Sequence, residues 1–400
     1  MELMADDATF PAVDDHLRAV DWQSLHGPYG SASDVPDLLR ALRNPDSAAR
    51  REAERKLEDH LQHQGLVYEP SIAVAPHLID LLANRNVPDR LVAYRLLRTI
   101  VDGVELYESP RRAVVPTLDD LADQRSEWWL ARSPEWRRHG GYRRPVTSAC
   151  HAAAYEAVHA GVPTYLRVLR DRDPELRLGM ADLLGRFPQD WSIMSPVLAQ
   201  QLLVETDLAV ATAMCIAVGR AGEPSQGSIV DAVRRWRGNA DRVVHRAALI
   251  GLVRLLPAPD TALLAELSDC LLDPEQKEWQ SLADTMANAA AWAFSGITGE
   301  SVPQLADLLL DRMRVPDPDR ADFLALRLLL GLTFPDGPLP DGAAFTDLSE
   351  PQQEIVRVVL HSNMLKQGMM IQRAIGECNL PNTEEALAAW YAGRRPFPDD

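Results

Sequence analysis

Apolar residues recur at helical spacing along most of the chain, in short segments separated by turns rich in Asp, Asn and Pro. The segment Val162–Pro188 shows this pattern most completely. Its first part places Leu166 and Leu169 on the side of Val162, which predicts a short amphipathic helix. Its second part predicts another helix, whose apolar face carries Leu176, Met180, Leu183 and Leu184. Neither helix can bury its apolar face alone, so the pair requires similar neighbours.

The chemistry of the turn supports the same two helices. Pro163 and Pro174 each fit the first turn of a helix, where the N–H that proline lacks would have no partner. The Asp residues of Asp171–Asp173 can cap the second helix, and Glu175 suits the positive end of its dipole. Phe187-Pro188 is predicted to end it.

The pair recurs along the chain. Pro36, Pro76 and Pro116 are evenly spaced and are each predicted to open a helix pair, and Pro163 and Pro196 follow at a shorter spacing. Three later segments fit with less regularity: Ser228–Leu256, Thr261–Phe294 and Pro303–Leu332. Self-similarity of this kind is typical of solenoid proteins.

The shared pattern, Pro-x-Leu-Leu, then Asp-Pro, then Arg, Ala and Leu-Gly, resembles HEAT repeats, including the bacterial HEAT-like repeats related to those of phycobilin lyases. The likeness covers about Asp34–Leu332. It implies an all-α fold, a right-handed α-solenoid of about eight HEAT-like helix pairs over residues 34–333.

The ends of the chain depart from the repeat. Residues 1–33 are expected to form an N-terminal cap and loop, and Phe334–Phe345 is a break rich in Pro and Gly. Residues 347–393 are expected to form a helical C-terminal cap, with helices over Glu350–Leu360, Asn363–Ile375 and Thr383–Tyr391. Signals for β-strands are nearly absent.

A second motif lies near the N-terminus. It combines Trp22, Leu25, Gly27, Tyr29 and Gly30 with a later group that includes His63, Gly65, Val67 and Tyr68. This motif is similar to uncharacterised bacterial HEAT-repeat proteins, some of which are encoded beside polymorphic toxins as presumed immunity proteins. The resemblance implies a role in binding a protein and no particular chemistry.

Composition narrows the class of partner. The formal charge of −17, from 41 basic and 58 acidic side chains, works against nucleic-acid binding and is compatible with a basic protein partner. The four cysteines are far apart and form no Cys-x-x-Cys motif, which indicates free thiols. The N-terminus lacks the profile of a signal peptide, and the longest apolar run is too short to cross a bilayer. We therefore expect a cytoplasmic protein that does not bind membranes.

One insertion interrupts the repeat, at residues 128–145. It gathers aromatic and basic side chains in an otherwise acidic protein, and such side chains dominate binding hot spots. We predict that a partner contacts Trp128, Trp129, Trp136, Arg137, Arg138 and Tyr142. The alternative is that the tryptophans cover a groove between repeats while the arginines pair with nearby carboxylates.

The helix predicted over Val146–Ala160 places His151, Tyr155 and His159 on one face. We include His151 and Tyr155 among the predicted partner contacts. A metal or acid–base site is the alternative reading, for these histidines and for His60 with His63, but neither pair has a third ligand at a zinc-site spacing. We predict no metal site, no cofactor and no catalytic residue.

Two hypotheses about function remain. The first is a non-enzymatic solenoid, a scaffold or immunity-type protein, that binds a protein or peptide on its concave face and through the Trp/Arg-rich insertion. The second is a HEAT-fold enzyme or lyase acting on a small molecule, modified base or peptide in the same groove. The sequence contains no Gly-x-Ser-x-Gly, phosphate-loop, His-Glu-x-x-His or dinucleotide-binding motif, which favours the first.

Overall fold

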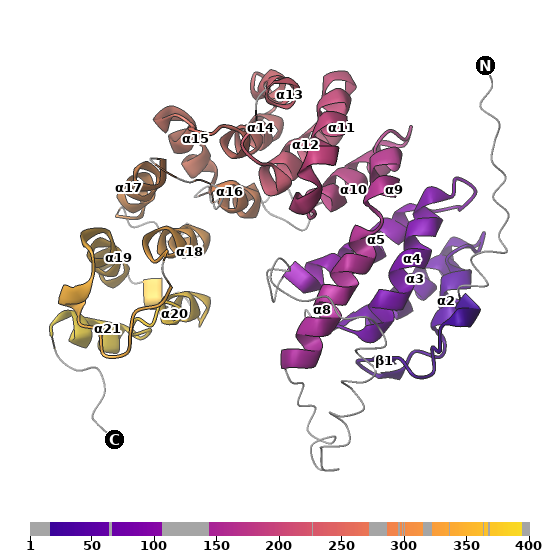
Figure 1. Cartoon of the computed structure of the whole chain (residues 1–400), viewed down its shortest axis with the longest axis horizontal. Coiled ribbons are helices and arrows are strands. Elements are labelled where there is room, and N and C mark those ends of the chain that lie inside the picture. The colour runs from indigo at the N-terminus through magenta and orange to yellow at the C-terminus, as the bar shows by residue number, and fades with distance from the viewer. Residues whose placement is uncertain are drawn as a thin grey trace, which may run out of the picture. The chain divides into compact units, whose positions relative to one another are not determined.

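The computed structural model describes residues 17–63, 66–105, 144–225, 227–271, 286–294, 297, 299, 301–314, 322–335, 337–362, 364–366 and 369–393. Within these ranges the chain is mostly helical, which confirms the all-α prediction (Figure 1). It divides into two compact units, Met1–Leu184 and Gly185–Asp400.

The first unit contains two short hairpins and a group of packed helices. The hairpins pair β1 (His26–Gly27) with β2 (Gly30–Ser31) and β3 (Gln62–His63) with β4 (Leu66–Val67), both antiparallel. The helices are α2 (Val35–Ala41), α3 (Ser47–Leu61), α4 (Glu69–Ala83), α5 (Leu91–Glu105), α8 (Arg144–His159), α9 (Val162–Val168) and α10 (Pro174–Leu184). Helix α5 packs against α3 on one side and α10 on the other, and α8 packs against both α4 and α5.

The second unit is helical throughout its described part. Its α-helices are α11 (Trp191–Val204), α12 (Leu208–Ala221), α13 (Ser228–Arg237), α14 (Arg242–Leu255), α15 (Thr261–Leu271), α16 (Met286–Phe294), α17 (Ser301–Met313), α18 (Asp322–Thr333), α19 (Glu350–His361), α20 (Met369–Gly376) and α21 (Glu384–Tyr391). Three 3₁₀ turns accompany them: η2 (Pro188–Asp190), η4 (Phe345–Asp347) and η5 (Met364–Lys366).

The helices of the second unit lie in two layers (Figure 1). In one layer α12, α14, α16, α18 and α20 each contact the next. In the other, α11 contacts α13, and α15, α17, α19 and α21 follow in order, with Arg237 of α13 paired to Glu266 of α15 at 3.2 Å. Consecutive helices of the sequence therefore alternate between the layers.

The second helix of several pairs begins at an Asp cap, as the turn chemistry predicts. The side chains of Asp46, Asp207 and Asp241 accept hydrogen bonds from the first backbone N–H groups of α3, α12 and α14. Helix α12 is then buried on all sides from Val210 to Ala221. Its thiol at Cys215 is fully buried, and burial raises the pKa of this group to about 12, so it stays uncharged.

Two predicted helix starts are wrong. Pro76 lies inside α4, which begins at Glu69-Pro70, and Pro196 lies inside α11. An interior proline costs one backbone hydrogen bond and strains the preceding turn. Burial of apolar side chains before and after it offsets that cost, as Val74 and Leu78 show on either side of Pro76.

Several other helices predicted from the sequence are present in the structure. Val162–Pro188 folds as α9 and α10, although Tyr165 is fully buried and the predicted core residue Leu166 is only partly so. In the C-terminal region, α19 and α21 match two predicted helices closely, and the third is divided into η5 and α20. The two hairpins were not predicted, since each strand has only two residues.

Candidate partner-binding surface

Most of the predicted contact residues lie outside the described part of the chain. Trp128, Trp129, Trp136, Arg137, Arg138 and Tyr142 all belong to residues 106–143. Their role in binding stays a prediction.

His151 and Tyr155 lie on α8, and both side chains are buried, with exposed fractions of 2% and 4%. The Nε2 atom of His151 accepts a hydrogen bond from the backbone N–H of Val67 at 3.1 Å, which fixes strand β4 against α8. The ring of Tyr155 stacks on the ring of His159, with the two ring centroids 6.2 Å apart. Their assignment as partner contacts stays a prediction, while the hydrogen bond of His151 is structural.

His60 and His63 bind separate partners. His60 Nε2 lies 2.9 Å from a carboxylate oxygen of Asp34, and His63 Nδ1 lies 3.0 Å from the hydroxyl of Tyr29. Among the described residues no group of three His, Cys, Asp or Glu side chains is placed to hold a metal ion. In this region the histidines fasten the two hairpins to each other and to the helices.

The N-terminal motif has a local structural meaning. Gly27 packs so closely on α3 that a Cβ there would lie 3.1 Å from the carbonyl oxygen of His60. The motif residue Tyr29 is at the tip of the first hairpin and reaches His63 in the second. The motif therefore specifies the paired hairpins.

A different element offers an exposed apolar surface. Helix α11 contains no charged residue between Trp191 and Val204. One side of it faces the core through Trp191, Met194, Leu198, Ala199 and Leu202. A helix without charged residues is expected to be mostly buried, yet the opposite side of α11 is open to solvent and carries apolar side chains around the exposed polar residue Gln200.

The residues of this open side are well exposed. The exposed fractions are 50% for Ile193, 46% for Leu203, 66% for Val204 and 43% for Leu208, the first residue of α12. Pro196 is exposed and Val197 is partly exposed between them. Ile193 and Val204 are about three turns apart and so lie on nearly the same side of the helix. We call these six residues the α11 surface.

The edge of the α11 surface is basic. Arg235 of the neighbouring helix α13 donates a hydrogen bond from Nη1 to the carbonyl oxygen of Leu203, at 2.8 Å. Arg234 is exposed beside it, with Asp231 at 3.0 Å. Because Arg234 is paired with Asp231, Arg235 is the basic side chain that contacts this apolar surface.

The sequence carries a signal for this surface that the repeat analysis missed. The run from Trp191 to Val204 lacks charge on any face, whereas α13 and α5 have clearly polar sides. Reading Pro196 as a helix start divided this run in two and concealed its length. A check for helices without a charged residue would have found it.

The fold and this surface define a helical protein that presents an apolar, basic-edged face. No model of a protein family matches the sequence, and no curated protein matches it. Two crystal structures of engineered proteins from the Northeast Structural Genomics Consortium are similar at 15% identity. The first has a TM-score of 0.31, and its alignment covers 90% of this chain and 88% of the engineered chain. The second has a TM-score of 0.32, and its alignment covers 75% of this chain and 96% of the engineered chain. These scores are too low to support an argument about fold or function.

Within the described ranges, no helix is both long enough and apolar enough to cross a membrane.

Proposed function

We propose that this protein is a right-handed, HEAT-like α-solenoid that binds a protein partner and carries out no chemistry of its own. The alternation of helices between two layers in the second unit supports the solenoid, because each pair then buries its apolar face on the next. The repeated Pro and Asp pattern of the sequence supports the HEAT-like class.

The observation that carries the proposal is the α11 surface. Contiguous exposed apolar patches with polar edges are characteristic of interaction sites. An apolar helix face accepts the apolar side of another helix, by the i, i+3, i+4, i+7 pattern of helix recognition. The partner segment we propose is therefore an amphipathic helix.

The basic edge specifies the charge of that helix. Arg235 lies at the edge of the α11 surface, so carboxylates on the flank of a docked helix would be favoured beside it. The net charge of the chain is compatible with a basic partner, but the local charge at the α11 surface favours an acidic segment. We propose an amphipathic segment with Asp or Glu beside its apolar stripe.

A scaffold or immunity-type role is the specific form of this function. It rests on the resemblance of the N-terminal motif to HEAT proteins encoded beside toxins. In such a role the partner segment would be held on the solenoid and kept from its own target.

Two synthetic peptides test the α11 surface directly. Both are helical and share one apolar stripe, and they differ only in carrying Glu or Lys along the flank. Fluorescence anisotropy should show the Glu peptide binding roughly tenfold more tightly than the Lys peptide, since the attraction of Arg235 for Glu and its repulsion of Lys contribute up to about 1 kcal/mol each. Ile193→Glu with Val204→Glu should abolish binding of the Glu peptide.

A matched control separates surface effects from added charge. Ala48→Glu with Ala240→Glu also adds two carboxylates at exposed positions, neither of which belongs to the α11 surface. This control should bind the Glu peptide as the parent does, and both doubles should keep the parent's unfolding midpoint. Equal binding of the two peptides, or unchanged binding by the Ile193/Val204 double, would show that α11 is not the site.

The Trp/Arg-rich insertion is a second proposed contact. Its test is Trp136→Ala with Arg137→Ala, which should weaken capture of a natural partner without changing the unfolding midpoint. The enzyme alternative has less support, because Nε2 of His151 already accepts the Val67 N–H and Tyr155 is buried.

A further inference from the structure

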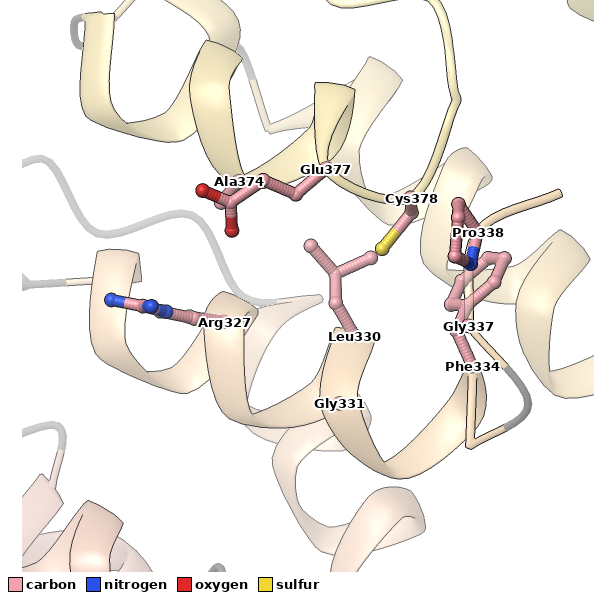
Figure 2. A pocket seen from close by; sticks show the side chains of 9 residues that line it. All are labelled: Arg327, Leu330, Gly331, Phe334, Gly337, Pro338, Ala374, Glu377 and Cys378. Carbon is pink, nitrogen blue, oxygen red and sulfur yellow. The ribbon is translucent and has the colours of Figure 1, made fainter. Parts of the chain in front are cut away.

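A pocket of about 220 Å³ lies in the second unit, between α18, the end of α20 and the loop that follows α18. Figure 2 shows the residues around it. Helix α18 supplies Arg327, Leu330 and Gly331, with Phe334 just beyond its end, and the opposite wall is Ala374, Glu377 and Cys378. Gly337 and Pro338 close one end.

Hydrogen bonds hold the walls of this pocket in place. The backbone N–H of Leu339 donates to the carbonyl oxygen of Cys378 at 3.1 Å. Asn379, in the left-handed region with φ 57°, donates from Nδ2 to the carbonyl oxygen of Leu339 at 2.8 Å and to a carboxylate oxygen of Asp341 at 3.0 Å. The loop is thus fixed to the end of α20, and the pocket is formed before any ligand arrives.

Two glycines line the open space. A Cβ built at Gly331 or at Gly337 meets no atom within 4 Å. Gly337 has a φ of 99°, which explains glycine there. Gly331 is inside α18, where glycine costs about 1 kcal/mol relative to alanine. Gly331 is exposed and lines the pocket, so a side chain there has room to extend beside it.

The pocket has a charged end and an apolar end. Arg327 and Glu377 come from opposite walls at the same end, and Phe334 and Pro338 form the other (Figure 2). Glu377 also pairs with Arg373, through one carboxylate oxygen at 3.2 Å. Burial, together with the Glu377 carboxylate, raises the pKa of the Cys378 thiol to about 11. The thiol is therefore uncharged near neutral pH and suits non-covalent contact.

We propose that this pocket binds a small zwitterion, an α-amino acid with an apolar side chain. Arg327 would pair with the carboxylate and Glu377 with the ammonium group, while the side chain would lie against Leu330, Phe334 and Pro338. The volume of about 220 Å³ is below the roughly 300–1,000 Å³ of typical ligand pockets, which favours a ligand as small as one amino acid. This site shares no residue with the α11 surface and does not depend on the proposed function.

Calorimetry with L-leucine, 4-methylpentanoic acid and 3-methylbutylamine tests the proposal on the full-length protein. The two analogues keep the apolar tail and lack the ammonium or the carboxylate. L-Leucine should bind at millimolar concentration or below, and each analogue should bind at least about tenfold more weakly, because each loses one charge-assisted contact.

Variants assign the contacts. Arg327→Gln should weaken L-leucine about tenfold, and Gly331→Leu should abolish binding by filling the pocket while favouring the helix. Arg234→Gln removes the same charge from an exposed position on α13, where Arg234 pairs with Asp231, and should retain binding. Circular dichroism checks that each variant folds.

Three results would overturn the assignment. One is the absence of heat from L-leucine, valine, isoleucine and methionine in the millimolar range. Another is an affinity for the amine-free or carboxylate-free analogue equal to that for L-leucine. The third is unchanged binding by Gly331→Leu, which would place any bound amino acid elsewhere.

Discussion

At the residue scale, one ion pair joins neighbouring helix pairs of the first unit. Arg90 lies just before α5. Its Nη1 donates a hydrogen bond to a carboxylate oxygen of Asp171 at 2.8 Å, and its Nε donates one to the carbonyl oxygen of Leu82 at 2.7 Å. The exposed fractions of the two charged side chains are only 10% and 13%. Asp171 precedes α10, so the pair fixes one turn against another.

The environment of Asp171 gives this pair a dependence on pH. Burial acts to raise the pKa of Asp171, but hydrogen bonds from Arg90 and from the backbone N–H of Asp173 outweigh it and leave the pKa lowered. A carboxyl whose folded pKa is depressed stabilises the fold above its unfolded pKa, about 3.9. The contribution is lost as the pH falls below that value.

Asp171→Asn should lower the free energy of unfolding by about 3 kcal/mol at pH 7, because it leaves a buried guanidinium without its counter-charge. The difference from the parent should shrink below about pH 4, where the parent's own carboxylate is protonated. Urea unfolding at the two pH values measures both effects. Asp37→Asn removes an exposed pairing with Arg40 and should change stability by less than about 0.5 kcal/mol. If the loss of unfolding free energy caused by Asp171→Asn were the same at both pH values, the ionised carboxylate of Asp171 would not be its source.

The same turn shows how far sequence reasoning reaches at this scale. The Asp residues and Pro174 predict a capped helix start, and Asp173 does accept the backbone N–H of Glu175 at 2.9 Å. The partner of Asp171 could not be predicted. Arg90 is far away in sequence, and only the packing of α5 on α10 brings it near.

At the element scale, small residues set how closely helices pack. A Cβ at Gly219 of α12 would lie 2.2 Å from Cγ2 of Ile250 on α14. Because glycine has no side chain, α12 and α14 can pack closely here, where a larger residue would collide with Ile250. Helix α12 is the most fully buried helix of the second unit among the described residues, so this contact is central to that unit.

Gly219→Ala should destabilise the protein by about 1–3 kcal/mol, the usual cost of overpacking. Ile250→Ala removes the methyl group in question and should cost about 2–5 kcal/mol by itself. The double variant should cost less than the sum of the two, since each change makes room for the other. Chemical unfolding of the four proteins measures the coupling, and strict additivity would show that the two residues do not meet.

Prolines explain where element prediction succeeds and fails. Pro36 and Pro163 occupy the first turns of α2 and α9, as predicted. Pro76 and Pro196 have the same sequence surroundings of apolar residues but lie inside longer helices. A proline indicates a helix start only when the preceding residues cannot themselves form a packed turn, and that depends on tertiary contacts. The α11 surface was hidden for this reason.

At the scale of the whole molecule, charge and composition predict only broad properties. The formal charge of −17 is a sum over the whole chain, and it gives no sign of the single arginine, Arg235, that contacts the α11 surface. The all-α class could be predicted from periodicity. The uncharged run of α11 is a sequence signal for the α11 surface, but the pocket has no such signal, because it depends on which side of a helix is left without a neighbour.

The two sites of the second unit should act independently. Ile193→Glu with Val204→Glu should leave the affinity for L-leucine unchanged, because the α11 surface and the pocket share no residue. Calorimetry on this double variant is the measurement. A simultaneous loss of peptide and leucine binding would indicate that the two substitutions disturb the fold. The binding of the Glu peptide would then be measured again with a milder substitution, such as Val204→Ser.

The central claim is that a partner segment docks on the α11 surface. Site-specific photo-crosslinking in the protein's native cells tests it most directly, with a benzophenone side chain placed at Val204, at Trp136 or at Ala48. The account predicts a cross-link from Val204 and none from Ala48, and mass spectrometry should find it on an amphipathic segment bearing Asp or Glu. A cross-link confined to Trp136, or one from Val204 to a segment without carboxylates, would contradict the account.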